Sequence, residues 1–286
     1  MKNTIRMELH KALYSKMLWL SVAVGLVFCT ADVVENAGKM YSFLESIEWI
    51  LSTDLRVSTD HTGYSLFYLW MGVGSCTRGA NLFYTVWPVL AAMAYGWSYS
   101  NERISGIYNQ MASRIGARFY YRAKYIAVFV SGGLAVGLPV LLNLLANALV
   151  CPYALIDASL GAVSNRNFLS ELYYTYPWAY GLIWCGMTFL FGGTTACLCL
   201  TLGTKLRYEV MVILVPYALY IGLDALITSL RPTLLRDVEF ALSPFRLLNS
   251  VPGFANPPWY LLAVLCVLNL AAFAVGYWQV VKHELV

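Results

Sequence analysis

Six stretches of the sequence are long and apolar enough to cross a membrane, and they constrain the fold more than any other feature. A membrane-spanning helix needs about 20 mostly apolar residues. The stretches cover residues 17–34, 82–99, 125–150, 177–202, 210–226 and 259–281. Only 12% of the residues are charged, whereas about 25% is usual in a soluble domain. The sequence therefore predicts an all-α membrane protein whose six transmembrane helices form a single domain over residues 1–286.

The distribution of lysine and arginine predicts the orientation of these helices. Twelve of the 19 basic residues lie before the first stretch, after the last, or in the second-to-third and fourth-to-fifth links. The positive-inside rule places these segments, and with them both termini, in the cytoplasm. The net charge of +4 reports this topology, and nothing in it indicates nucleic-acid binding.

The loop at 36–81 is the longest polar region and is predicted to be extracellular. Its apolar segment at 64–74 has eleven residues, too few to cross, so we expect it to fold back within the loop. If this segment did cross, every later orientation would reverse. Earlier in the loop a helical stripe predicts an amphipathic helix, which either lies at the outer surface or packs on its own bundle. The stripe consists of Met40, Phe43, Leu44, Ile47, Ile50 and Leu51.

The N-terminal segment 1–16 forms a smaller stripe through Ile5, Leu9, Ala12 and Leu13, which predicts an interfacial helix. No cleavage site for a signal peptide follows it, so the first span is expected to be retained. The seven cysteines lack the spacing of metal ligands. Cys76 and Cys151 would both lie outside and would be able to pair.

The link at 101–124 is unusual because it has the pattern of a helix. Apolar residues recur at helical spacing, and most basic residues fall elsewhere on the wheel. The apolar positions are Ile104, Ile107, Tyr108, Met111, Ile115 and Phe119. We interpret the link as a cytoplasmic amphipathic helix. Either anionic lipid alone holds it at the membrane, or it docks on a protein partner.

The layout of this chain resembles the permeases of type-2 ATP-binding cassette (ABC) transporters. That family has an N-terminal interfacial helix, six spans and a coupling helix between spans two and three that docks on an ATPase subunit. Its motif matches Glu102, Gly106, the pair Ser113–Arg114 and Lys124. Ile107 departs from the usual Thr or Ser, and Met111–Ala112 stands where a proline is common. The resemblance implies that the ATPase-docking residues are Glu102, Gly106, Ile107, Tyr108, Met111, Arg114 and Arg118.

The resemblance also implies a function. A permease of this family works as a pair of identical or related protomers in the bacterial plasma membrane, surrounded by membrane lipid. The chain has no G-x-x-x-x-G-K-[ST] loop for phosphates, so ATP and Mg are expected in separate ABC ATPase subunits. The expected activity is ATP-driven export of an amphipathic molecule, such as a peptide, a drug or a lipid-like compound.

In the resembled family, spans two and five line the substrate path between protomers. The corresponding candidates here are Trp87, Tyr95, Tyr217, Tyr220 and Asp224. The alternative role for the aromatic residues is packing in the bundle core. Asn143, Asn147 and Asn269 lie inside spans, where amides join helices by hydrogen bonds as readily as they touch cargo.

Two other membrane functions stay open. An ion-coupled secondary transporter would use Asp224 and a helix broken at Gly192–Gly193. A non-transporting membrane subunit would only recruit a partner. An enzyme is not expected and no catalytic residue is assigned, because His10, His61 and His283 all lie outside the spans and no catalytic motif occurs.

Overall fold

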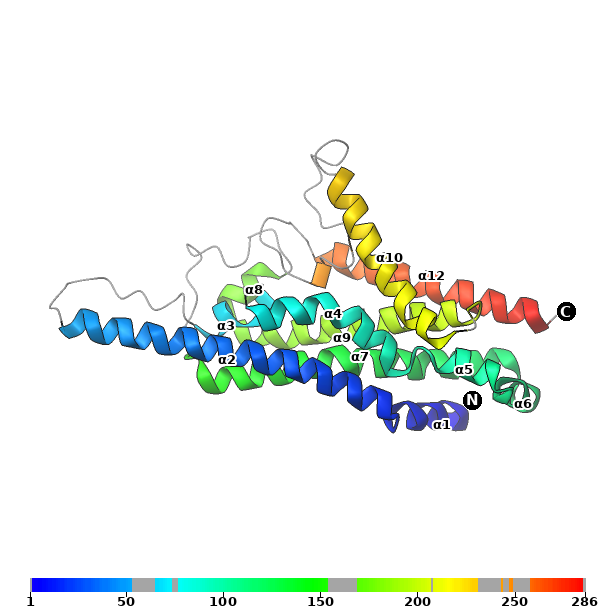
Figure 1. Ribbon diagram of the computed structural model, residues 1–286. Coiled ribbons are helices and arrows are strands. Elements are labelled where there is room, and N and C mark those ends of the chain that lie inside the picture. Colours follow the sequence, from blue (N-terminus) through cyan, green and yellow to red (C-terminus); the bar gives the residue numbers. More distant parts are fainter. Residues whose placement is uncertain are drawn as a thin grey trace.

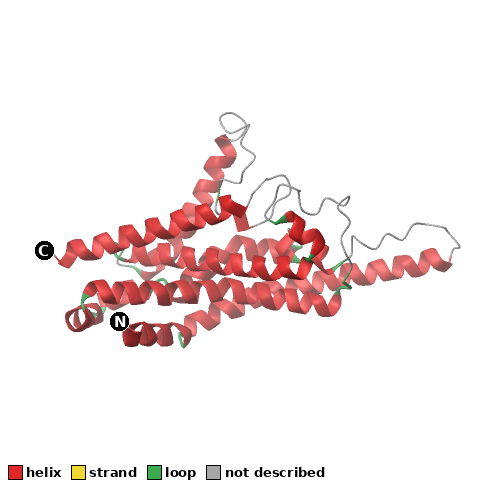
Figure 2. Ribbon diagram, turned by 180° about the vertical axis from the view of Figure 1, so that it is seen from behind, coloured by secondary structure: helices red, strands yellow, loops and turns green. Residues whose placement is uncertain are grey.

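The computed structural model describes residues 2–52, 65–73, 77–153, 169–206, 208–230, 243, 247–248 and 258–284. Most of these residues are helical, and none lies in a strand. Figure 1 shows the long helices running side by side in an elongated bundle, and Figure 2 shows the same arrangement from behind. The predicted all-α class is confirmed.

Five helices in the described part of the chain are long and apolar enough to span a membrane. They are α2 (Lys16–Ser52), α7 (Ala117–Val150), α9 (Pro177–Gly203), α10 (Glu209–Leu230) and α12 (Pro258–Glu284). They correspond to five of the six predicted spans, which makes this a chain of the multi-pass membrane type. The remaining stretch, 82–99, is divided between α4 (Arg78–Tyr95) and the start of α5 (Ser98–Ile104).

Helix α4 lies inside the bundle although it is shorter and less apolar than the others. It contacts α2, α7 and α9, and Phe83, Trp87 and Ala91 on it are fully buried. Its first turn is capped by Thr77, whose Oγ1 accepts a hydrogen bond from the Ala80 amide. Burial against neighbouring helices therefore stabilises a helix that hydropathy alone ranks below the rest.

Helix α2 is longer than predicted, because the first span and the amphipathic helix of the following loop are continuous. The part from Gly38 onward contains no described side chain that is buried, and it extends beyond the end of the bundle (Figure 1). The predicted helix is therefore present as a continuation of the first span, and the expectation that it packs on the bundle or caps its end is wrong. No proline interrupts residues 16–52, and Gly38 alone costs a helix only about 1 kcal/mol.

The short apolar segment predicted to fold back does so. Residues 65–73 form α3 (Leu66–Leu69) and the 3-10 turn η2 (Met71–Val73), and Phe67, Trp70 and Met71 are fully buried. The Leu66 amide donates to the Pro152 carbonyl at 2.9 Å. These residues close one end of the bundle, which we call the α3 end.

Helices α7 and α9 form the most closely packed pair, and glycines make this possible. A Cβ atom on Gly132 would lie 2.3 Å from the Ala196 Cβ, and one on Gly192 would lie 2.6 Å from the Gly132 carbonyl oxygen. Small residues of this kind let membrane helices approach closely. Helix α9 is continuous through Gly192 and Gly193, so the helix break expected for a secondary transporter is absent from it.

Helices α10 and α12 lie at the periphery. Only Val212, Pro216 and Tyr220 of α10 are buried, and the helix leans away from the bundle beyond them (Figures 1 and 2). Both termini lie at the same end of the bundle as α5 and α6 (Ile107–Ile115). We call this the α6 end. Cys151 is buried and free, and its proposed partner Cys76 lies outside the described residues.

The glycine contact between α7 and α9 gives a first prediction. Gly132→Ala should lower the free energy of unfolding by about 1–3 kcal/mol, because its methyl group has no space in the contact. Gly186→Ala on the same pair is the control, since nothing lies within 4 Å of a Cβ there. Thermal unfolding in detergent measures both variants. Equal midpoints for the two would contradict the packing described.

Candidate functional site

The link between α4 and α7 consists of two short helices, α5 and α6, separated by glycine turns. Gly106 has φ +75° and precedes α6, and Gly116 has φ +87° and follows it. Residues that carry a side chain rarely adopt such positive φ values, so glycine suits both positions. The prediction of one amphipathic helix over 101–124 is therefore wrong. The chain turns twice, and residues 117–124 already belong to α7.

Helix α6 packs one face against the bundle and exposes the other, and none of its residues is fully buried. Tyr108 and Met111 are half-buried against the bundle. The Tyr108 ring lies 5.3 Å from that of Tyr99. Ile107 is 45% exposed, and Ile104 at the end of α5 is 61% exposed.

The predicted docking residues therefore fall into three groups. Ile107, Arg114 and Arg118 are exposed. Tyr108 and Met111 hold α6 on its own bundle. Gly106 makes the turn, and Glu102 belongs to a buried network of ion pairs.

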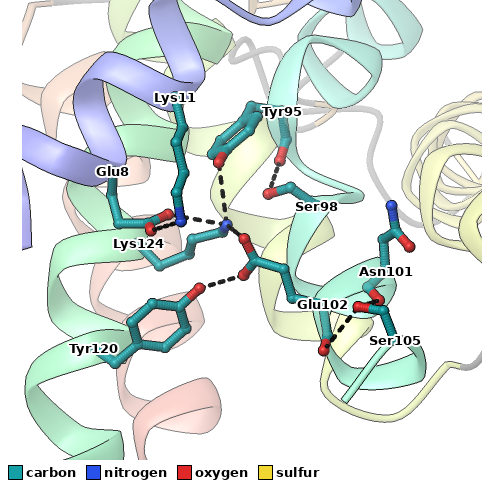
Figure 3. A network of polar contacts seen from close by, with 9 residues as sticks. All are labelled: Glu8, Lys11, Tyr95, Ser98, Asn101, Glu102, Ser105, Tyr120 and Lys124. Carbon is teal, nitrogen blue, oxygen red and sulfur yellow. Dashed lines mark hydrogen bonds and ion pairs between the residues drawn. The ribbon is translucent and has the colours of Figure 1, made fainter. Parts of the chain in front are cut away.

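Lys124 is the centre of that network (Figure 3). Its side chain is fully buried, and Nζ lies 2.7 Å from the Glu102 carboxylate and 3.0 Å from that of Glu8. Nζ also donates to the Tyr95 hydroxyl at 3.2 Å, and it lies 4.5 Å from the centre of the Tyr95 ring. A buried ammonium needs such partners, because an unpaired charge removed from water costs several kcal/mol.

Two further contacts complete the network. Lys11 Nζ lies 2.7 Å from the second oxygen of Glu8, and the Tyr120 hydroxyl donates to the Glu102 carboxylate. Two lysines thus balance two glutamates. The network joins α1 (Lys2–Leu13), α4, α5 and α7 at the α6 end.

The sequence places Lys124 and Glu102 in the motif of the coupling helix and Tyr95 among the substrate-path candidates. It does not indicate a role for Glu8. Glu8 lies between Thr4 and Ala12 on the buried face of α1. The one sequence feature that could have indicated a buried role for Glu8 is its position as the single carboxylate beside the apolar stripe of a basic helix. Nothing in the sequence connects it to a lysine 116 positions later.

A second polar cluster lies near the α3 end. Asp32 is fully buried, and its carboxylate accepts from Asn143 Nδ2 at 2.9 Å and Asn147 Nδ2 at 3.2 Å. The Thr77 hydroxyl also donates to it. Asn36 donates to the Asn147 amide oxygen at 3.0 Å and to the Leu69 carbonyl at 3.2 Å. The cluster therefore joins α7, α2, α3 and the residue that caps α4.

Asn269 joins helices in the same way. Its Nδ2 donates to the Thr194 hydroxyl of α9 at 2.6 Å, and its backbone carbonyl oxygen accepts from the Tyr125 hydroxyl of α7 at 3.0 Å. All three candidate asparagines thus make the interhelical hydrogen bonds considered from the sequence.

The two polar clusters are separated by about the thickness of a bilayer. Lys124 and Asn143 lie on one continuous helix, 19 residues apart. At 1.5 Å per residue the separation is about 28 Å, and the hydrocarbon core of a bilayer is about 30 Å thick. The spacing of the two clusters is therefore close to the thickness of that core.

The structure brings together only part of the predicted substrate path. The rings of Trp87 and Tyr220 lie 5.9 Å apart where α4 meets α10, and the Tyr220 hydroxyl lies 3.1 Å from that of Thr195. Tyr217 is half-buried on the same helix. Asp224 lies beyond Tyr220, in the part of α10 that has no buried residue. Tyr95 belongs to the Lys124 network.

Among the described residues, no group of three or more His, Cys, Asp or Glu side chains lies close enough to hold a metal ion. No protein-family model matches the chain, and no curated protein or solved structure matches it either. The geometry at the α6 end is therefore the basis for inferring function.

The Lys124 network gives a second prediction. Lys124→Ala should lower the free energy of unfolding by about 3–5 kcal/mol, because it leaves two carboxylates without their shared cation. Adding Glu8→Gln and Glu102→Gln should restore part of the loss. Unfolding in detergent at neutral pH measures all the variants.

Lys39→Ala is the control for this experiment. Lys39 forms a partly exposed ion pair with Glu35 at 3.9 Å, and pairs near the surface contribute about 0–1 kcal/mol. If Lys124→Ala cost no more than Lys39→Ala, the network would not have the stabilising role assigned to it.

Proposed function

We propose that this chain is the permease subunit of an ABC exporter and that α6, together with the end of α5, is the surface on which a separate ATPase subunit docks. The observation that carries the proposal is the exposed face of the α5–α6 turn. The side chains of Ile104 and Ile107 are exposed, while the Lys124 network and Tyr108 hold the same turn in place. An exposed apolar surface on a firmly held element is typical of a protein interface.

The proposed topology has six spans, with α4 and α5 together as the second. Helix α4 lies among membrane-type helices and contacts four of them, α2, α7, α9 and α10, which supports counting it as a span. Six spans place both termini on one side, in keeping with their common position at the α6 end (Figure 1). The exposed basic residues Arg103, Arg114, Arg118 and Lys205 lie in this part of the chain, which favours the cytoplasm for the α6 end.

The proposed cargo is an amphipathic molecule that moves between two protomers along α4 and α10. Trp87 and Tyr220 form the aromatic contact between these helices, and α10 is held by a single stripe of three buried residues. ATP and Mg would bind to the partner ATPase. A non-transporting subunit would share the docking surface, and ATP-dependent efflux from vesicles separates the two functions.

The docking surface gives a third prediction. Ile107→Asp should reduce the amount of ATPase subunit that copurifies from native membranes more than ten-fold, because losing a buried interface anchor costs about 2 kcal/mol or more. Aspartate is well tolerated in the first turn of a helix, so α6 should keep its fold. Arg114→Lys should have a smaller effect in the same direction, since lysine does not reproduce directed guanidinium bonds.

Asn3→Asp, an exposed change in the first turn of α1, is the control and should leave copurification unchanged. Gly106→Pro should abolish it, because proline fixes φ near −65° where the chain needs +75°. Retained ATPase binding in Ile107→Asp, or labelling of a Ser105→Cys variant from outside the cell, would overturn the docking assignment.

A further inference from the structure

A cavity lies at the α6 end, between α6 and the last turns of α12. Its volume is about 460 Å³, within the range of about 300–1,000 Å³ that is typical of small-molecule sites. Residues of α5, α6, α7 and α12 line it, together with Thr204 at the end of α9. A single ligand in this cavity would therefore contact five separate parts of the bundle.

The charge in this cavity comes from Arg103. None of the described residues that line the cavity is acidic, and Arg103 is the one basic residue among them. Its Nη1 donates to the backbone carbonyls of Gly203 and Thr204. A guanidinium has five N–H donors, and those on Nη2 and Nε bind no acceptor among the described residues. Two N–H groups on one edge of a guanidinium suit a carboxylate or a phosphate, which accepts both bonds in parallel.

Two side-chain amides add further polar groups to the cavity. Asn109 of α6 is exposed, and Gln279 of α12 is half-buried. The Gln279 amide is hydrogen-bonded to the Thr204 hydroxyl, which holds it in the cavity wall. An amide nitrogen carries two N–H donors, so Gln279 keeps at least one of them for a ligand in either orientation of its amide.

The rest of the cavity wall is aromatic and aliphatic. Tyr99 and Tyr108 line it with rings that lie 5.3 Å apart. Ala112, Ala117 and Val280 line it with short aliphatic side chains. Pockets that hold small organic molecules combine apolar walls with a few polar groups in this way. The cavity therefore suits a molecule that has both an acidic group and an apolar body.

We infer that this cavity binds a small organic anion, with its carboxylate or phosphate ester on Arg103 and its apolar body against Tyr108 and Val280. The inference does not depend on the proposed ATPase partner. No residue of α6 is fully buried, and a ligand would connect α6 to α12 through new contacts. Binding should therefore hold α6 more firmly on the bundle.

The test uses phenyl phosphate and benzoate as separate probes of the whole protein in detergent. Calorimetric titration should show that at least one of them binds, and the tighter one identifies the acidic group. Inorganic phosphate and benzyl alcohol should each bind at least ten-fold more weakly than that probe, because each lacks one of the two parts. Hydrogen exchange of the backbone over residues 107–115 should slow when the probe is bound.

Two variants test the residues of the cavity. Arg103→Lys should weaken binding at least ten-fold, because lysine does not make the paired bonds. Lysine would also lose the bonds to the end of α9, so Ala112→Leu is the second variant. It fills the cavity from α6 without removing a hydrogen bond, and it should abolish binding.

Arg6→Lys is the matched control, because Arg6 is exposed on α1 and does not line the cavity. It should bind the probe like the wild type, and thermal unfolding should show that all the variants are folded. The inference is overturned if neither probe binds the wild type, if folded Ala112→Leu binds as tightly as the wild type, or if Arg103→Lys weakens binding no more than Arg6→Lys.

Discussion

The burial of Lys124 is the constraint on which the rest of the α6 end depends. A fully buried ammonium must have counter-charges close by, and this one takes them from α1 and α5. The three helices that carry Glu8, Glu102 and Lys124 are therefore fixed relative to one another. Once α5 is fixed, the turn at Gly106 determines where α6 points. The exposure of Ile104 and Ile107 is a consequence of these ion pairs.

Polar groups at the other end of α7 have the corresponding role. Asp32 accepts hydrogen bonds from two asparagines of α7 and from Thr77, which precedes α4. The interior between the two clusters contains apolar side chains, glycine contacts such as that of Gly132 with Ala196, and a few interhelical hydrogen bonds such as that of Asn269 with Thr194. In a bilayer, close packing and buried hydrogen bonds replace the hydrophobic effect as the forces that hold helices together. The bundle combines close packing in the middle with larger polar clusters towards its two ends.

The parts of the fold that depend on local pattern were predictable from the sequence. Five spans follow from length and hydropathy, and the folded-back segment at 65–73 follows from being too short to cross. The continuous α2 was not predicted, because the polar composition after residue 34 suggested that the first helix ends there, whereas it continues to Ser52. The turns at Gly106 and Gly116 were not predicted, because the presence of a glycine does not by itself show that its backbone takes a positive φ.

The candidate site was harder to predict, for two physical reasons. The ion pair between Glu8 and Lys124 joins residues 116 positions apart, and a single sequence carries no signal for such a contact. Periodicity showed that one face of α6 is apolar, but not whether that face turns inward or outward. Tyr108 and Met111 turn inward, so the exposed residues at the turn, rather than the centre of the stripe, form the available surface.

The central claim is that the Lys124 network presents the α5–α6 turn to an ATPase in the cytoplasm. Photo-crosslinking from a reactive amino acid introduced at Ile107, in native membranes, tests it most directly. The account predicts a crosslink to a single ATP-hydrolysing subunit, and a much weaker crosslink when Lys124→Ala disturbs the network that holds the turn. Crosslinking of Ile107 to lipid alone, or to a protein on the outer side of the membrane, would contradict it.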